Sequence, residues 1–335
     1  MNGQFLRIGC IAWDDITKLS RELRSRWAFR GQSDGAWGLV SSLERAFQQF
    51  ECPPEARRAA ELEIFRQFQR SAHHHVREAP KPNDLIEWFA LMQHHGAPTR
   101  LLDFTYSFYV AAFFASESLT DMSAIWGLNL SRLSRRLATS HADLPDPSRT
   151  GPGLTAHAYN ELASSFVRAD RVSPGLVPVE PERKNERLSI QQGLFLFPAD
   201  ITVPCEQNLA DTFGIDPGEF SRKDGAFSYS RDELLRESCE SSDMIKIEIP
   251  RSVQAEALAM LRSVNLTAAT LFPGLDGFAR SLRQYASLSA VSLDVYPPSR
   301  HSGIPPFRTV LPPSAAFPPT ENPEIQSLQG PSGGN

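Results

Sequence analysis

The sequence has few cysteines and no long hydrophobic run. The four cysteines are far apart and form no CxxC pair, at Cys10, Cys52, Cys205 and Cys239. With no secretory signal at the N-terminus, this usage predicts reduced thiols and a cytoplasmic location. The most apolar stretch, 104–115, is too short to span a bilayer and contains two tyrosines. We therefore expect a soluble protein with no membrane partner.

Charge of one sign is not in excess either. The chain has 34 Lys and Arg against 39 Asp and Glu, a formal net charge of -5. Nucleic-acid scaffolds usually show a basic excess or stripe, so the net charge does not indicate a nucleic-acid partner. The sequence also lacks a P-loop, a GxGxxG, an HExxH and a legible Ser-His-Asp order. We expect no metal, and no familiar motif discloses a reaction.

What is present is a mixture of helical and extended patterns without regular βαβ alternation. The predicted strands are Arg26–Gln32, Ala124–Leu130, Leu188–Phe197 and Met244–Ile249. The predicted helices are Glu55–Arg77, the segment from Asp84 to Gly96, Phe104–Ser118 and Val253–Val264. This mixture predicts an α+β fold, with helices around a small, mostly antiparallel sheet.

Composition divides the chain into three parts. Residues 1–25 form an N-terminal segment, and residues 26–296 form one domain. Within that domain, residues 131–187 are rich in proline and glycine, and we predict a loop-rich insertion there. The Pro/Ser/Gly-rich tail, 297–335, cannot bury enough apolar surface to offset its ordering entropy, which predicts disorder.

The segment QHHGAPTRLLDFT, residues 93–105, has the highest density of special residues. Its Arg100 and Asp103 are either structural, with Asp103 pairing Arg100 or Arg30, or part of an anion site at the start of the next helix. His95 ends the preceding predicted helix and is a candidate general acid or base. Zinc is disfavoured because adjacent histidines point in different directions.

Arg30 lies on a predicted strand, on the face opposite Trp27 and Phe29. One interpretation is a buried ion pair, because an unpaired guanidinium is costly to bury. The other is an anion clamp that binds phosphate through its planar fork, with Gly31 letting a ligand approach the backbone and Gln32 beside it.

Gln191 and Gln192 interrupt an apolar stretch that the pattern predicts to be a strand. They either tie this strand to the Arg30 strand by hydrogen bonds or orient a substrate. On a strand the two side chains face opposite sides, and Gln191 shares its face with Gly193, which leaves it the clearer approach to a ligand.

Four stretches together resemble the FRG domain family, in this order along the chain. They are FRGQ at 29–32, QHHGAPTRLLDFT at 93–105, QQGLF at 191–195 and LFPGLDG at 271–277. The family often has Trp after the motif aspartate, where this chain has Phe104. The resemblance implies a bacterial protein with a defence or toxin role against phage, although the family's biochemical role is largely undefined.

An arginine on an early strand, an aromatic-rich middle element and a polar amide or acid on a later strand also resemble the ADP-ribosyltransferase plan. That resemblance implies an NAD-using enzyme, with Arg30 as the clamp and Gln191 or Gln192 orienting the ribose. Gly31, Gln32, Arg100 and Asp103 would complete the binding site for a nucleotide or phosphate. The alternative is a nucleotide-sensing or protein-interaction module without turnover. A nuclease-like toxin ranks last, since the sequence shows no cluster of metal-binding carboxylates.

Overall fold

The structure is a computed structural model that describes residues 3–23, 27–141, 143–144, 152–221, 239 and 241–283. The tail that we predict to be disordered, 297–335, lies outside the described residues. The strands are β1 (Phe5–Gly9), β2 (Trp27–Gln32), β3 (Leu102–Thr105), β4 (Met122–Asn129), β5 (Leu176–Val179), β6 (Gly193–Pro198) and β7 (Met244–Pro250). The helices are α1 (Trp13–Glu22), α2 (Ser42–Gln49), η1 (Pro54–Ala56), α3 (Arg57–Ala72), α4 (Leu85–His94), α5 (Phe108–Ser116), α6 (Leu130–Ser140), α7 (Pro152–Arg168), α8 (Glu186–Ile190), α9 (Cys205–Phe213), α10 (Gly218–Ser221), α12 (Arg251–Ser263), α13 (Ala268–Leu271) and α14 (Leu275–Ser281).

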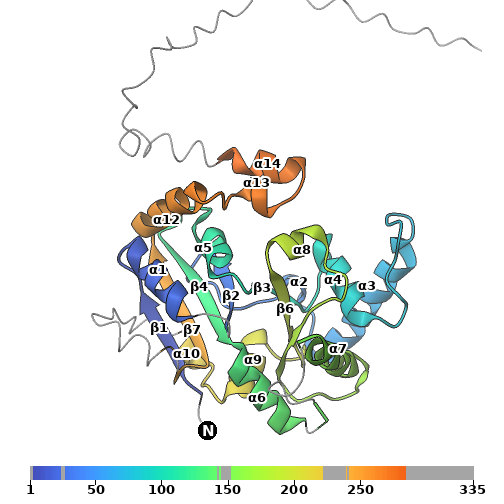
Figure 1. The fold of residues 1–335 in the computed structure, drawn as a ribbon. Coiled ribbons are helices and arrows are strands. Elements are labelled where there is room, and N and C mark those ends of the chain that lie inside the picture. The colour runs from blue at the N-terminus through green and yellow to red at the C-terminus, as the bar shows by residue number, and fades with distance from the viewer. Residues whose placement is uncertain are drawn as a thin grey trace, which may run out of the picture. The chain divides into compact units, whose positions relative to one another are not determined.

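The seven strands form one sheet in the order β1-β7-β4-β2-β3-β6-β5 (Figure 1). β1 runs parallel to β7, and the other five neighbouring pairs are antiparallel. The sequence-based prediction of an α+β fold with a mostly antiparallel sheet is therefore confirmed.

Helices cover both faces of this sheet. α1, α5 and α12 pack on one face, and α6, α7 and α9 pack on the other (Figure 1). The strand period of two separates the two cores, because Phe29 joins the first core and Ala28 the second. Phe29 meets Phe108 of α5 edge to face, with ring centroids 5.1 Å apart. Arg30 thus lies opposite the aromatic face, as the alternation predicts.

Gly31 serves the packing of α5 on β2 and not the approach of a ligand. A Cβ at Gly31 would collide with the carbonyl oxygen of Ala111 and lie 2.6 Å from the amide nitrogen of Ala115. Both atoms belong to the helix backbone, which cannot move aside as a flexible side chain can. The interpretation of Gly31 as an opening for a ligand is wrong.

The segments predicted as loops at 131–187 are better ordered than the composition indicates. The described residues there include most of α6, all of α7 and the edge strand β5. α6 buries Leu133 and Leu137, and β5 buries Leu176 and Val177. Proline and glycine lie between these elements without preventing them, so the described part of 131–187 holds more regular structure than its composition indicates. The domain boundaries remain a prediction, although β1 joins the same sheet as the later strands.

Two predicted elements near the motifs are also corrected. The helix predicted from Phe104 is preceded by β3 and begins after Ser107, whose Oγ accepts a hydrogen bond from the Val110 amide at 3.3 Å. The strand predicted at 188–197 begins only at Gly193, because α8 occupies 186–190. In both places a short element borders another with a similar apolar content, which hides the change of period.

Arg100 forms the most buried ion pair in the part of the chain described, and its partner is Glu61 of α3. The Arg100 Nε donates to one Glu61 oxygen at 2.6 Å, and a second guanidinium nitrogen donates to the other. The remaining nitrogen donates to the carbonyls of Pro198 and Ala199 at 3.2 and 3.0 Å. Arg100 is only 2% exposed. Of the two arginine partners left open for Asp103, the structure pairs it with Arg30, because α3 places the Glu61 carboxylate beneath the Arg100 guanidinium.

Replacing Glu61 with glutamine should lower the free energy of unfolding by roughly 3–5 kcal/mol, because it leaves a buried guanidinium without its counter-charge. Denaturant unfolding followed by circular dichroism measures this change. Glu63→Gln is the matched control, since Glu63 lies on the exposed side of the same helix. Its effect should stay within about 0.5 kcal/mol. Equal stability of the two variants would mean that the pair does not stabilise the fold.

Replacing Gly31 with alanine should destabilise the protein by about 1–3 kcal/mol, since β2 and α5 must separate to admit a methyl group. Gly175→Ala is the control, because the nearest atom to a Cβ there is 3.8 Å away. The midpoint of thermal unfolding should fall for the first variant and hardly move for the second. A Gly31→Ala protein as stable as Gly175→Ala would contradict the close approach of α5.

Candidate functional site

The predicted motifs meet around the seam between β2 and β3. A cavity of about 70 Å³ opens on the other side of β3, where Asp103 pairs with Phe195 of β6, and we call it the motif cavity. It is lined by residues of α4, β3, α8 and β6, among them Gln93, His94, Asp103, Arg187 and Gln191. The fold thus assembles residues that are far apart in sequence, since Gln93 and Gln191, 98 positions apart, line the same cavity.

Arg30 and Asp103 hold the seam together. Within these strands, β2 and β3 pair at Phe29 and Thr105. Farther along, an Arg30 guanidinium nitrogen donates to the Asp103 carbonyl at 2.9 Å and lies 3.8 Å from its carboxylate. Burial lowers the pKa of Arg30, and Asp103 raises it. The Arg30 side chain is 20% exposed and that of Asp103 60%. Arg30 does not line the motif cavity, whereas Asp103 does.

Gln93 positions the Asp103 carboxylate, a role that sequence reasoning missed. Its Nε2 donates to Asp103 Oδ2 at 2.9 Å. Its Oε1 accepts a hydrogen bond from the Thr99 hydroxyl, which determines the orientation of the amide. The sequence signal that could have indicated this role is the position of Gln93 at the start of the motif, ten residues before Asp103.

The structure brings Gln191 to the cavity but not Gln192. Both lie in the turn between α8 and β6, where Gln192 has a φ of 49°. The argument from strand alternation therefore does not apply to them. The Gln191 Nε2 donates to the carbonyl of Leu271 at 3.0 Å, which attaches the fourth motif stretch to this site. The side-chain donor of Gln191 is thus already engaged.

Arg187 is a second cavity residue that sequence reasoning missed. Its guanidinium lies 4.6 Å from the centroid of the Phe272 ring, and it donates no hydrogen bond to any described residue. Burial lowers the pKa of Arg187, Asp103 raises it, and Arg280 lowers it. Arg187 precedes Gln191 by four residues, so recognising α8 as a helix would have placed both on one side.

The two motif histidines differ in position. His94 lines the motif cavity, and burial, then His95 and Arg187, lower its pKa. His95 is the C-cap of α4, is exposed and does not line the cavity. The structure therefore does not bring His95, the predicted acid or base, to this site.

Gln32 and Arg100 are occupied in the interior. The Gln32 amide accepts from Trp126 Nε1 at 2.7 Å and donates to the Gly38 carbonyl at 3.0 Å. Arg100 is bound to Glu61. Neither side chain lines the motif cavity.

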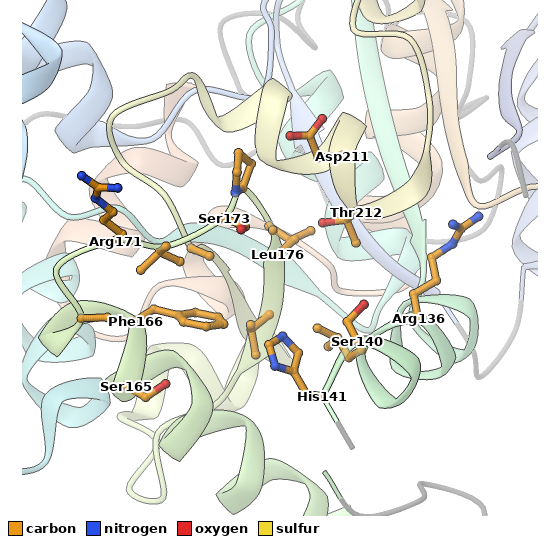
Figure 2. A pocket seen from close by; sticks show the side chains of 17 residues that line it. Arg136, Ser140, His141, Ser165, Phe166, Arg171, Ser173, Leu176, Asp211 and Thr212 are labelled. Carbon is orange, nitrogen blue, oxygen red and sulfur yellow. The ribbon is translucent and has the colours of Figure 1, made fainter. Parts of the chain in front are cut away.

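A larger cavity, of about 550 Å³, lies between α6, α7, β5 and α9 (Figure 2). It is lined by His141, Arg136 and Asp211, and by no predicted site residue. Among the described residues there is no group of three or more His, Cys, Asp or Glu side chains that could hold a metal ion. The described helices include none that is long and apolar enough to cross a membrane.

Comparison with known families now supports the resemblance. The sequence model of the FRG domain matches residues 25–123, which include Arg30, Gln93 and Asp103. No curated protein and no solved structure matches the chain. The matched region contains the elements that form the seam, from β2 through α4 to β3. The chain therefore carries an FRG domain.

Proposed function

We propose that the FRG domain binds NAD at the motif cavity and breaks its glycosidic bond, as ADP-ribosyltransferases do. The observation that carries this proposal is that one cavity is lined by both a guanidinium, that of Arg187, and a carboxylate, that of Asp103. Arg187 offers unused donors, and Asp103 offers an exposed carboxylate. A dinucleotide presents the complementary groups, namely phosphate oxygens and ribose hydroxyls.

Arg187 is the contact for a phosphate. A guanidinium presents a planar fork of donors that matches two phosphate oxygens. The neighbouring Arg280 is less free, because it donates two hydrogen bonds to Glu117. Both guanidinium groups lie over the Phe272 ring, at 4.6 and 4.2 Å from its centroid. This stacking holds Arg187 in place without using its hydrogen-bond donors.

Asp103 takes the ribose-orienting role that the resemblance gives to Gln191 or Gln192. Glutamine cannot act as a carboxylate base, and the Gln191 donor is engaged with Leu271. Asp103 is a carboxylate, is oriented by Gln93, and is accessible from the cavity. It can accept a hydrogen bond from a ribose hydroxyl, which supports charge developing on the ribose. Arg30 then acts as a positioning residue behind Asp103 and not as the clamp.

The size of the cavity limits how much of the ligand it holds. About 70 Å³ admits one phosphate or part of a ribose, whereas whole-ligand pockets usually occupy roughly 300–1,000 Å³. The rest of NAD would lie on the surface outside. In the reaction, the bond from ribose C1′ to nicotinamide breaks, nicotinamide leaves with the electron pair, and a nucleophile bonds to C1′ and loses its proton. Water as the nucleophile gives hydrolysis, and a target side chain gives transfer, as a toxin or defence effector would require.

The small cavity also favours a second candidate, a nucleotide-sensing module without turnover. Such a module needs Arg187 to bind phosphate but does not need the Asp103 carboxylate. The two functions therefore differ in their dependence on these residues, and two variants separate them.

Replacing Arg187 with methionine should weaken NAD binding by roughly tenfold to a hundredfold, because a charge-assisted hydrogen bond to phosphate is lost. Titration calorimetry on the full chain measures this change. Arg183→Met is the matched control, since Arg183 is a nearby exposed arginine that does not line the cavity. If wild-type protein shows no NAD binding, the NAD-using function is excluded at this site.

Replacing Asp103 with asparagine should abolish nicotinamide release and leave NAD affinity within about threefold of wild type, since shape is kept and charge is lost. Chromatographic assay of free nicotinamide, beside calorimetry, measures both quantities. Binding by wild type without release would favour the sensing module. Release by Asp103→Asn at the wild-type rate would remove Asp103 from the reaction.

A further inference from the structure

We propose a second ligand site, distinct from the motif cavity, that binds a small molecule carrying a phosphate or carboxylate group and an aromatic ring. It is a cavity of about 850 Å³ at the β1 edge of the sheet, and we call it the Lys246 cavity. It is lined by Arg7, Trp37, Glu206, Phe220, Lys246 and Glu248.

Strand register places two cations side by side in this cavity. Arg7 of β1 is the direct neighbour of Lys246 on β7, and Lys246 is the direct neighbour of Trp126 on β4. Directly opposed residues in a sheet share one face, so the three side chains form a row. The Lys246 Nζ lies 4.8 Å from the centroid of the Trp126 ring. Like charges opposite each other destabilise a sheet unless an anion lies between or beside them.

The donors of both cations are not matched by the protein. One Arg7 nitrogen donates to Glu248, but its Nε and its other terminal nitrogen are buried without a partner. Lys246 is 5% exposed and has no hydrogen bond or ion pair with a described residue. Burial lowers the pKa of Lys246, and Glu248 raises it. Unsatisfied buried donors are costly, so an acceptor from outside the chain would complete the site.

Glu248, Glu206 and Asp34 attract Lys246 and raise its pKa, but none of them accepts a hydrogen bond from its Nζ or from the two unpartnered Arg7 nitrogens. Glu248 already binds Arg7, and a Glu206 oxygen accepts the Leu39 amide at 3.1 Å. Asp34 accepts the Ala36 amide at 2.8 Å, and Asp121 is exposed at the rim. These carboxylates can accept hydrogen bonds from hydroxyl or amino groups of a ligand. Arg7 and Lys246, in contrast, require an oxyanion as their acceptor.

Trp37 is the reason to expect an aromatic ring in the ligand. Its side chain lines the cavity and is 55% exposed, which is unusual for so large an apolar surface. A planar ring stacked on an exposed indole covers that surface. A ligand with an anionic group at Arg7 and Lys246 and a ring against Trp37 uses both features.

Binding to the full chain is tested with AMP as the phosphate probe and benzoate as the carboxylate probe, with inorganic phosphate and adenosine as partial ligands. We expect one of the two complete probes to raise the thermal midpoint and to bind more tightly than either partial ligand. Lys246→Met should weaken that binding roughly tenfold to a hundredfold. It should lower the stability of the ligand-free protein only modestly, because Lys246 has no hydrogen bond or ion pair with a described residue to lose, and loses only its contact with Trp126 and its attraction to Glu248, Glu206 and Asp34.

Lys81→Met is the control, since it removes the same charge from an exposed lysine outside the cavity. Trp37→Ala should also weaken binding, and it changes a side chain that is largely exposed. No binding of AMP or of benzoate would overturn the proposal, with water then completing the buried donors. Binding that is unchanged in Lys246→Met but lost in Arg187→Met would also overturn it, because the probe would then occupy the motif cavity.

Discussion

A chain of hydrogen bonds from Thr99 through Gln93 to Asp103 holds the motif segment against Arg30. It joins the end of α4 to β3 and β3 to β2, at the place where the two strands stop pairing. Without a partner, the Arg30 guanidinium would be a costly charge at this seam. Asp103 accepts one Arg30 nitrogen through its carbonyl, while the Arg30 Nε stays buried without a partner and the Asp103 carboxylate stays accessible. The same interaction therefore maintains the sheet and presents the acidic group of the site.

The cations of this protein divide into two kinds according to their partners. Arg100 is fully engaged by Glu61 and two carbonyls, and it stabilises the interior. Arg187 and Lys246 are substantially buried yet donate no hydrogen bond to a described residue. Burial penalises an unpaired charge in either case. Both unpaired cations line cavities, which is why the proposed ligands of both sites are oxyanions.

Sequence patterns predicted several elements well but missed the helices α6 and α7. The period of two identified β2 and β7 and placed Arg30 opposite Phe29. The sequence-based prediction failed where a short element directly adjoins another helix or strand. β3 has four residues and precedes α5 directly, so the apolar content of both resembled one helix. The turn at 191–192 was read as strand because the local sequence does not show where α8 ends.

By itself, the sequence determined the fold class and the likeness of residues 25–123 to the FRG domain, since these follow from periodicity and from motif residues in a defined order. Only the tertiary structure decided which charged side chains lie next to one another. Glu61 and Arg100 are far apart in sequence, and nothing local indicates that α3 brings them together. The same holds for Arg7 beside Lys246, which only the pairing of β1 with β7 makes neighbours. Electrostatic partners depend on distances in space, and strand register sets those distances.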